Sequence, residues 1–138
     1  MHPTVSIIVP NYNHQNFLKQ RLDSIFNQTF QDFEVLIFDD ASTDGSLEIL
    51  ELYKEHPKVS CYIVNQHNSG SPFKQWRKGL ELAKGEYIWI AESDDFSSEF
   101  FLASLVKSFI DPTVVISHCR SFNYYDGKDN SVLELNKW

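Results

Sequence analysis

Short apolar runs alternate along the chain with segments in which apolar residues recur every three or four positions. The short runs predict strands, and the repeats predict amphipathic helices between them. The predicted strands cover residues 4–9, 33–38, 59–64, 86–91 and 113–117, with a candidate sixth strand at 122–125. The predicted helices cover residues 15–28, 45–56, 73–84 and 97–110.

Alternating strands and helices with short connections are typical of βαβ units. We therefore predict an α/β fold with a mainly parallel sheet and helices on both of its faces. In such sheets a ligand binds beyond the carboxyl ends of the strands. The residues that follow each predicted strand are therefore the first candidates for a functional site.

Three of the predicted strands end in polar or acidic residues. They are followed by Pro10-Asn11-Tyr12-Asn13, by Asp39-Asp40 and by Glu92-Ser93-Asp94-Asp95. Because parallel strands end at one edge of the sheet, we expect five carboxylates to crowd there and to repel one another. A divalent cation, Mn²⁺ or Mg²⁺, is the simplest compensation, since it prefers carboxylate oxygens and shares its ligands with phosphates. The alternative is that these acids only cap helices or end solvated loops, as we expect for Asp44.

Individual residues at these ends suit a nucleotide ligand. Residues two apart in an extended segment point to one side, so Glu92 and Asp94 are expected to face one ligand while Ser93 faces away. A carboxylate at Asp40 accepts hydrogen bonds and suits the imide N–H of uracil. Tyr12 suits stacking on the base, although an ordinary surface tyrosine is the alternative.

A basic group follows the polar loop at residues 66–72. The amino end of the helix predicted at 73–84 offers free amides that suit a diphosphate. Lys74 and Arg77 are candidates to contact it, with solvated surface groups as the alternative.

Composition excludes several classes of protein. The chain has 138 residues, 42% of them hydrophobic, and a net charge of −7, which predicts one folded domain and argues against binding to a nucleic-acid backbone. Its apolar runs are too short to span a membrane, and no hydrophobic leader is visible, so we expect a cytoplasmic protein. Cys61 and Cys119 are too few for a disulfide scaffold or a zinc site. Motifs of P-loop, dinucleotide-binding and Gly-x-Ser-x-Gly enzymes are absent from the sequence.

Four segments together resemble the family 2 glycosyltransferases of the GT-A fold. They are residues 5–13 (VSIIVPNYN), 27–30 (NQTF), 33–46 (FEVLIFDDASTDGS) and 85–95 (GEYIWIAESDD). The match is collinear from about residue 3 to residue 127. The resemblance implies a Rossmann-like, nucleotide-diphospho-sugar transferase fold, with residues 1–138 as a single nucleotide-sugar-binding domain that lacks most of the acceptor-binding part.

The resemblance also implies site roles. Tyr12 would lie against the base, Asp40 would recognise uracil with support from Asp39, and Glu92-Ser93-Asp94 matches the Asp-x-Asp motif with Glu in place of the more usual Asp. The residues implied in nucleotide binding are Pro10, Tyr12, Asn13, Asp39, Asp40, Lys74, Glu92 and Ser93, and those implied in metal binding are Asp94 and Asp95.

The activity implied is metal-dependent, inverting transfer of a sugar from a UDP-sugar to a hydroxyl of a carbohydrate or lipid-linked glycan, as in polysaccharide biosynthesis. Such an enzyme is expected in the cytoplasm or peripherally at the inner membrane face. We expect the catalytic base beyond Trp138, so the isolated chain would bind a donor without transferring its sugar. Exposed aromatic residues near Trp138 and an open sheet edge suggest self-association.

Two other classes of protein stay open. A nucleotidyltransferase also combines acidic strand ends with a metal, but it would normally carry a Gly-rich basic loop where this chain has Pro10-Asn11-Tyr12-Asn13. The other alternative is a catalytically inert nucleotide-binding module.

Overall fold

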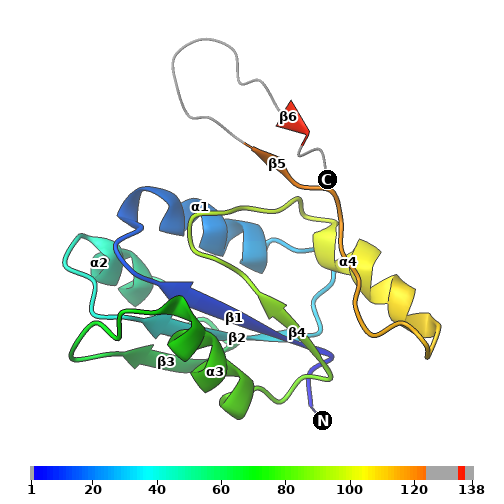
Figure 1. Cartoon of the computed structure of the whole chain (residues 1–138), viewed down its shortest axis with the longest axis horizontal. Helices are drawn as coiled ribbons and strands as arrows, with labels where there is room; N and C mark the ends of the chain where they lie inside the picture. The colour runs from blue at the N-terminus through cyan, green and yellow to red at the C-terminus, as the bar shows by residue number, and fades with distance from the viewer. Residues whose placement is uncertain (1, 124–133, 136–138) are drawn as a thin grey trace. The chain divides into compact units, whose positions relative to one another are not determined.

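The first of two compact units contains a parallel sheet. The computed structural model describes residues 2–123 and 134–135, and the chain divides into units Met1–Phe100 and Phe101–Trp138. In the first unit the strand order is β3-β2-β1-β4 (Figure 1). The strands are β1 (Val5–Asn11), β2 (Phe33–Asp39), β3 (Val59–Val64) and β4 (Tyr87–Ile90), and the helices are α1 (Gln15–Phe26), α2 (Ser46–Glu51) and α3 (Pro72–Leu82). The predicted strands and helices of this unit are therefore present, with α2 ending earlier than expected.

The two central strands are buried along their whole length. Every residue of β1 and of β2 is buried, as their continuous apolar runs predict for a sheet covered on both faces. The sequence predicted that the first strand ends before Pro10, but β1 continues along β2 to Asn11. Pairing with β4 stops at Ile8, whose carbonyl accepts the last bond from Ala91 at 2.8 Å. Proline has no N–H to donate to a neighbouring strand. Pro10 is tolerated because β4 has already ended on the side where this N–H would point.

The direction of the chain across the sheet reverses at β1. The chain runs from β1 through α1, β2 and α2 to β3, and α3 then returns it to β4 on the other side of β1. Right-handed crossovers place α1 and α2 on one face and α3 on the opposite face, as Figure 1 shows. Ligands of open α/β sheets bind at such a reversal, so the carboxyl ends of β1 and β4 are the expected place for a site.

A buried polar cluster fixes the connection from α3 to β4 at the amino end of the sheet. The Ser6 hydroxyl donates to Glu34 at 2.6 Å and accepts from the Gly85 amide at 2.8 Å, and the Lys84 amide donates to Glu34 at 2.7 Å. Burial raises the pKa of Glu34, but hydrogen bonds from Ser6, Ser60 and the Lys84 amide outweigh it and lower that pKa. A Cβ at Gly85 would lie 2.4 Å from the Ser6 nitrogen, so only glycine allows this approach.

The second unit differs from the sequence prediction. The helix expected over residues 97–110 is α4 (Phe101–Val106) followed by a 3₁₀ turn, η1 (Lys107–Ile110). Residues 113–117 do not form the expected strand, and Val115 and Ile116 are 89% and 77% exposed. An apolar run becomes a strand only where a neighbouring strand accepts its backbone hydrogen bonds, and this run pairs with none of the described strands.

The last described strands are short. β5 (Phe122–Asn123) pairs antiparallel with β6 (Glu134–Leu135), and residues 124 and 125 of the expected sixth strand lie outside the described residues, as does Trp138. The expectation of a single domain over residues 1–138 stays a prediction. Among the described residues, the helices are all too short or too polar to cross a membrane.

Replacement of Gly85 by Ala should destabilise the fold by about 1–3 kcal/mol, because the new methyl group overlaps the β1 backbone and displaces the bond to Ser6. Urea unfolding would measure this change. Lys84→Ala is the matched control, because that variant keeps the neighbouring amide that binds Glu34. Equal stability of the Gly85 variant and the control would contradict the close approach.

Candidate functional site

The ends of β1 and β2 are joined through Asp39. The Asp39 carboxylate is fully buried and accepts from the Asn11 side chain at 2.8 Å, the Ser42 amide at 2.8 Å and the Ser42 hydroxyl at 2.6 Å. Asn13, with φ of 55°, accepts from the Thr43 amide at 2.7 Å and donates its own amide to the Ser42 hydroxyl at 2.9 Å. Through these hydrogen bonds, Asp39 and Asn13 join the segment that contains Tyr12 to the loop that follows β2.

Asp40 is held by the segment that follows β3. The residue is 4% exposed, and its carboxylate accepts from Asn65 at 2.6 Å, Gln75 at 2.9 Å, and the amide and hydroxyl of Ser69 at 3.0 and 2.7 Å. Burial raises the pKa of Asp40, but the hydrogen bonds from Ser69 and Asn65 and the charge of Lys78 bring it below its ordinary value. Asp40 is therefore ionised at neutral pH, and donors of this chain engage both of its oxygens.

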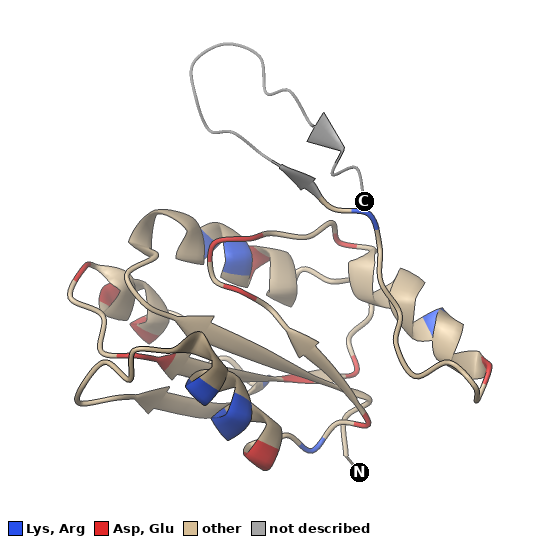
Figure 2. Cartoon of the chain, viewed as in Figure 1, with Lys and Arg blue, Asp and Glu red and all other residues tan. Residues whose placement is uncertain are grey.

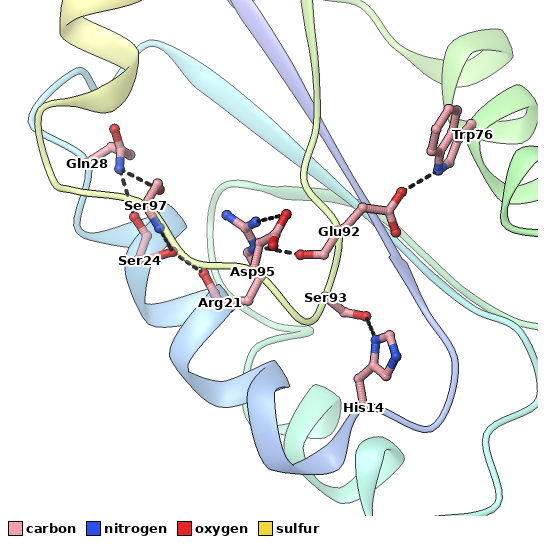
Figure 3. A network of polar contacts seen from close by, with 9 residues as sticks. All are labelled: His14, Arg21, Ser24, Gln28, Trp76, Glu92, Ser93, Asp95 and Ser97. Carbon is pink, nitrogen blue, oxygen red and sulfur yellow. Dashed lines mark hydrogen bonds and ion pairs between the residues drawn. The ribbon is translucent and has the colours of Figure 1, made fainter. Parts of the chain in front are cut away.

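Residues 92–95 form a turn. The Asp95 amide donates to the Glu92 carbonyl at 3.3 Å, so the prediction that Glu92 and Asp94 share one side of an extended segment is wrong. The extended backbone ends where pairing of β4 with β1 ends. Ser93 is buried, with its hydroxyl 2.7 Å from Nδ1 of His14, while Asp94 and Asp95 are exposed (Figure 3).

Two consecutive residues of α3 connect the acidic ends of β2 and β4. Gln75 donates to Asp40, and the indole N–H of Trp76 donates to Oε1 of Glu92 at 2.8 Å (Figure 3). Burial raises the pKa of Glu92, the Trp76 bond opposes this, and the charges of Asp94 and Asp95 raise it further. Asp40 and Glu92, from two of the acidic strand ends, are therefore both bound by α3, whereas the convergence of all three strand ends on one ligand stays a prediction.

Most of the five acids have partners within the chain. Asp39 and Asp40 accept from amides and hydroxyls, Glu92 accepts from Trp76, and Asp95 lies 3.5 Å from a guanidinium nitrogen of Arg21. Asp94 makes neither a hydrogen bond nor a close ion pair with any described residue. The crowding of acids therefore does not by itself require a cation, contrary to the expectation, because local donors offset it. Within residues 2–123 and 134–135, no three His, Cys, Asp or Glu side chains are grouped to hold a metal.

The remaining predicted residues lie at different distances from this network. Pro10 is buried in β1, and Tyr12 is 45% exposed. Lys74 is exposed and donates to the Ser69 carbonyl at 2.7 Å, which places it beside the Asp40 cluster. Arg77 instead pairs with Glu81 at 3.0 Å, and both side chains are exposed. Figure 2 shows that α3 carries both basic and acidic positions.

Sequence reasoning missed the residues that hold the acids in place. They are Arg21, Asn65, Ser69, Gln75 and Trp76. For Arg21 a signal existed, because it occupies the buried face of α1 together with Leu18, Leu22 and Ile25. A charged residue on an apolar helix face requires a specific partner.

Comparisons with known proteins agree with this geometry. A family model described as "Glycosyl transferase family 2" matches residues 6–137. The chain is 40% identical over 94 residues to a poly(ribitol-phosphate) beta-glucosyltransferase of Bacillus spizizenii. The aligned residues make up 67% of this chain and 15% of that protein. The crystal structure of S. aureus TarS 1-349 in complex with UDP-GlcNAc matches 96% of this chain and 37% of its own, with 30% identity and a TM-score of 0.71.

A second solved structure is similar to the same degree. The mannosyltransferase PcManGT from Pyrobaculum calidifontis, in complex with GDP-Man and Mn²⁺, matches 83% of this chain and 34% of its own, with 31% identity and a TM-score of 0.71. These matches confirm the predicted α/β fold of the GT-A type. The chain spans less than half the length of each of these three proteins.

Asp40→Asn should destabilise the protein by about 1–3 kcal/mol near neutral pH, because an amide nitrogen would then face the donors of Ser69, Asn65 or Gln75. The folded-state pKa of Asp40 is lowered, so its contribution is complete above the ordinary pKa of 3.8 and is lost as the pH falls through the folded-state pKa. The stability difference from the unmodified protein should therefore stay constant from about pH 7 to about pH 5 and shrink as the pH falls below the ordinary pKa of 3.8, as urea unfolding would measure. Glu55→Gln, at an exposed acid, is the control, and a difference that is constant with pH would contradict this role.

Proposed function

The chain belongs to glycosyl transferase family 2, and from this premise we propose that it forms the donor-binding part of an enzyme that transfers a sugar from a UDP-sugar to a hydroxyl acceptor. The observation that carries the proposal is that Asp40 and Glu92, at the ends of β2 and β4, each accept a hydrogen bond from one of two consecutive residues of α3. The UDP-GlcNAc and GDP-Man complexes of similar proteins support a sugar nucleotide as the ligand.

In this proposal the uridine lies over the ends of β1 and β2. The half-exposed ring of Tyr12 stacks on the base, beside Pro10, while Asp39 and Asn13 hold the loop in place. The Asp40 carboxylate accepts a hydrogen bond from the base N–H. That bond shares an oxygen with, or replaces, one of the hydrogen bonds that the carboxylate now accepts. Glu92 uses Oε1 for Trp76, which leaves Oε2 for a ribose hydroxyl, and Ser93 keeps the turn against His14.

The diphosphate lies at the turn of residues 92–95. Carboxylate oxygens of Asp94 and Asp95 are ligands that Mn²⁺ and Mg²⁺ prefer, and Asp94 is exposed and lacks a close partner among the described residues. These residues fit a divalent ion that takes its other ligands from the diphosphate and water. A bound ion would neutralise the charge that grows on the departing diphosphate. Lys74, which donates to the Ser69 carbonyl beside the Asp40 cluster, adds positive charge to the nucleotide site near the base.

The acceptor and the catalytic base belong to parts of the enzyme outside the described residues. In inverting transfer a carboxylate base removes the proton of the acceptor hydroxyl. We propose a carbohydrate or lipid-linked glycan as the acceptor class, reached from the cytoplasmic side of a membrane. The name of the similar poly(ribitol-phosphate) beta-glucosyltransferase supports a polymer as the acceptor. Product analysis tests the reaction type, because glycosyl transfer releases UDP whereas nucleotidyl transfer releases pyrophosphate.

Asp94→Ala should weaken UDP binding in the presence of manganese by at least about tenfold, since it removes a charged ligand worth more than about 1.4 kcal/mol. Isothermal titration calorimetry of the intact protein with UDP, with Mn²⁺ or with EDTA, measures this change. Glu48→Ala, which removes an exposed acid on α2, is the control and should bind as the unmodified protein does. Unchanged affinity in a folded Asp94 variant would reject Asp94 as a metal ligand, and absence of UDP binding by the unmodified protein would reject the proposed function.

A further inference from the structure

Arg21 is a buried cation on the helix that faces the acidic turn. It shares the buried side of α1 with Leu18, Leu22 and Ile25, and its side chain is 4% exposed. A buried guanidinium is costly unless charged and polar partners surround it. What Arg21 contacts therefore indicates why the chain carries a charge on this face.

Among the described residues, the partners of the Arg21 side chain belong to β4 and the turn after it. Nε donates to the Glu92 carbonyl at 2.7 Å, and one terminal nitrogen lies 3.5 Å from the Asp95 carboxylate (Figure 3). The guanidinium lies 5.5 Å from the ring centre of Trp89. The other terminal nitrogen is buried without a hydrogen-bond partner among the described residues. Because the guanidinium leaves one hydrogen-bond donor unsatisfied, stabilisation of the fold alone is a weak explanation for this buried charge.

The same helix holds the rest of the segment through neutral groups. The Ser24 hydroxyl accepts from the Ser97 amide at 3.3 Å, and Gln28 donates to the Ser97 hydroxyl at 3.3 Å and to the Ser98 carbonyl at 2.6 Å. His14 contacts Ser93 at the other end of α1. Figure 3 shows these side chains following one another along α1 toward the segment. Arg21 differs from these neutral side chains because it brings a positive charge to the acidic part of the segment.

The three acids of the turn are consequently not equivalent. Glu92 is fixed through its carbonyl by Arg21 and through its carboxylate by Trp76, and Asp95 pairs with Arg21. Asp94, between them, is exposed and lacks a close partner among the described residues. Arg21 also offsets the mutual repulsion of three carboxylates within four residues, which would otherwise favour opening of the turn.

We propose that Arg21 is a positioning residue that holds the turn of residues 92–95 in place, so that Asp94 is presented as the free carboxylate at the diphosphate end of the donor site. This inference rests on the proposed function, since it assigns the residue that prepares the turn for a metal-bound diphosphate. Arg21 acts through Glu92 and Asp95, and within the described part of the chain its side-chain hydrogen bond and ion pair involve none of Pro10, Tyr12 and Asp40. Its influence therefore falls on the metal-dependent part of donor binding.

The test compares UDP binding by Arg21→Met and by the unmodified intact protein, with Mn²⁺ and with EDTA, by isothermal titration calorimetry. Arg21→Met should bind UDP about tenfold more weakly with Mn²⁺ and lose much less affinity with EDTA, because the base end of the site is untouched and Glu92 keeps its bond to Trp76. The matched control is Lys19→Met, which removes the same charge from the exposed side of α1 and should change neither affinity. Circular dichroism melting checks that each variant is folded.

Two results would overturn the inference: full manganese-dependent affinity in folded Arg21→Met, or an equal loss with and without the metal, which would indicate a merely structural role. Should Arg21→Met not fold, Arg21→Lys replaces it, since that variant keeps the charge but cannot reproduce the Nε bond to Glu92. It should lose about threefold in affinity with Mn²⁺ alone, and parity with the unmodified protein would overturn the proposal. If the unmodified protein shows no UDP binding or no manganese effect, the proposed function itself fails, which is distinct from failure of Arg21 alone.

Discussion

Parallel pairing on both sides of β1 is the constraint from which the rest of the molecule follows. The strand is buried from Val5 to Asn11, so its backbone groups are satisfied by β2 and β4 and its side chains by the helices that cover the sheet. Polar side chains along this strand are admitted only with partners, as Ser6 is with Glu34. At the carboxyl end of β1, β4 has already ended and the order of strands reverses. A ligand site can therefore form there.

Each acid at that end is held by donors from a different part of the chain. The loop after β2 satisfies Asp39, the segment after β3 satisfies Asp40, and α3 and α1 satisfy the turn that begins at Glu92. Acidic side chains are thus held at one edge of the sheet by hydrogen-bond donors of the chain itself. The arrangement stabilises the charged state of Asp40 while it raises the pKa of Glu92, so neighbouring carboxylates differ in proton affinity.

Local pattern predicts the elements but not their partners. The apolar runs identify the four strands of the sheet, and in the structure α3 binds an acid at the end of β2 and another at the end of β4. The run at 113–117 has equally good strand character, but pairing depends on a neighbour that periodicity does not reveal. The turn at 92–95 was missed for a related reason, since extended geometry ends with the ladder and a carbonyl 71 positions from Arg21 accepts its bond. The predicted strand ends identified the acids and the family resemblance gave them roles, whereas the groups that hold them come from tertiary contacts that a local pattern does not reveal.

The bond between Trp76 and Glu92 links two sequence positions that belong to different elements. An aspartate at position 92 would be shorter by one methylene, about 1.5 Å, and would not reach the indole N–H from the same backbone. A smaller residue at position 76 would likewise leave the longer glutamate side chain without its donor. We therefore expect positions 76 and 92 to covary among related proteins. Relatives with aspartate at position 92 should carry a residue other than tryptophan at position 76.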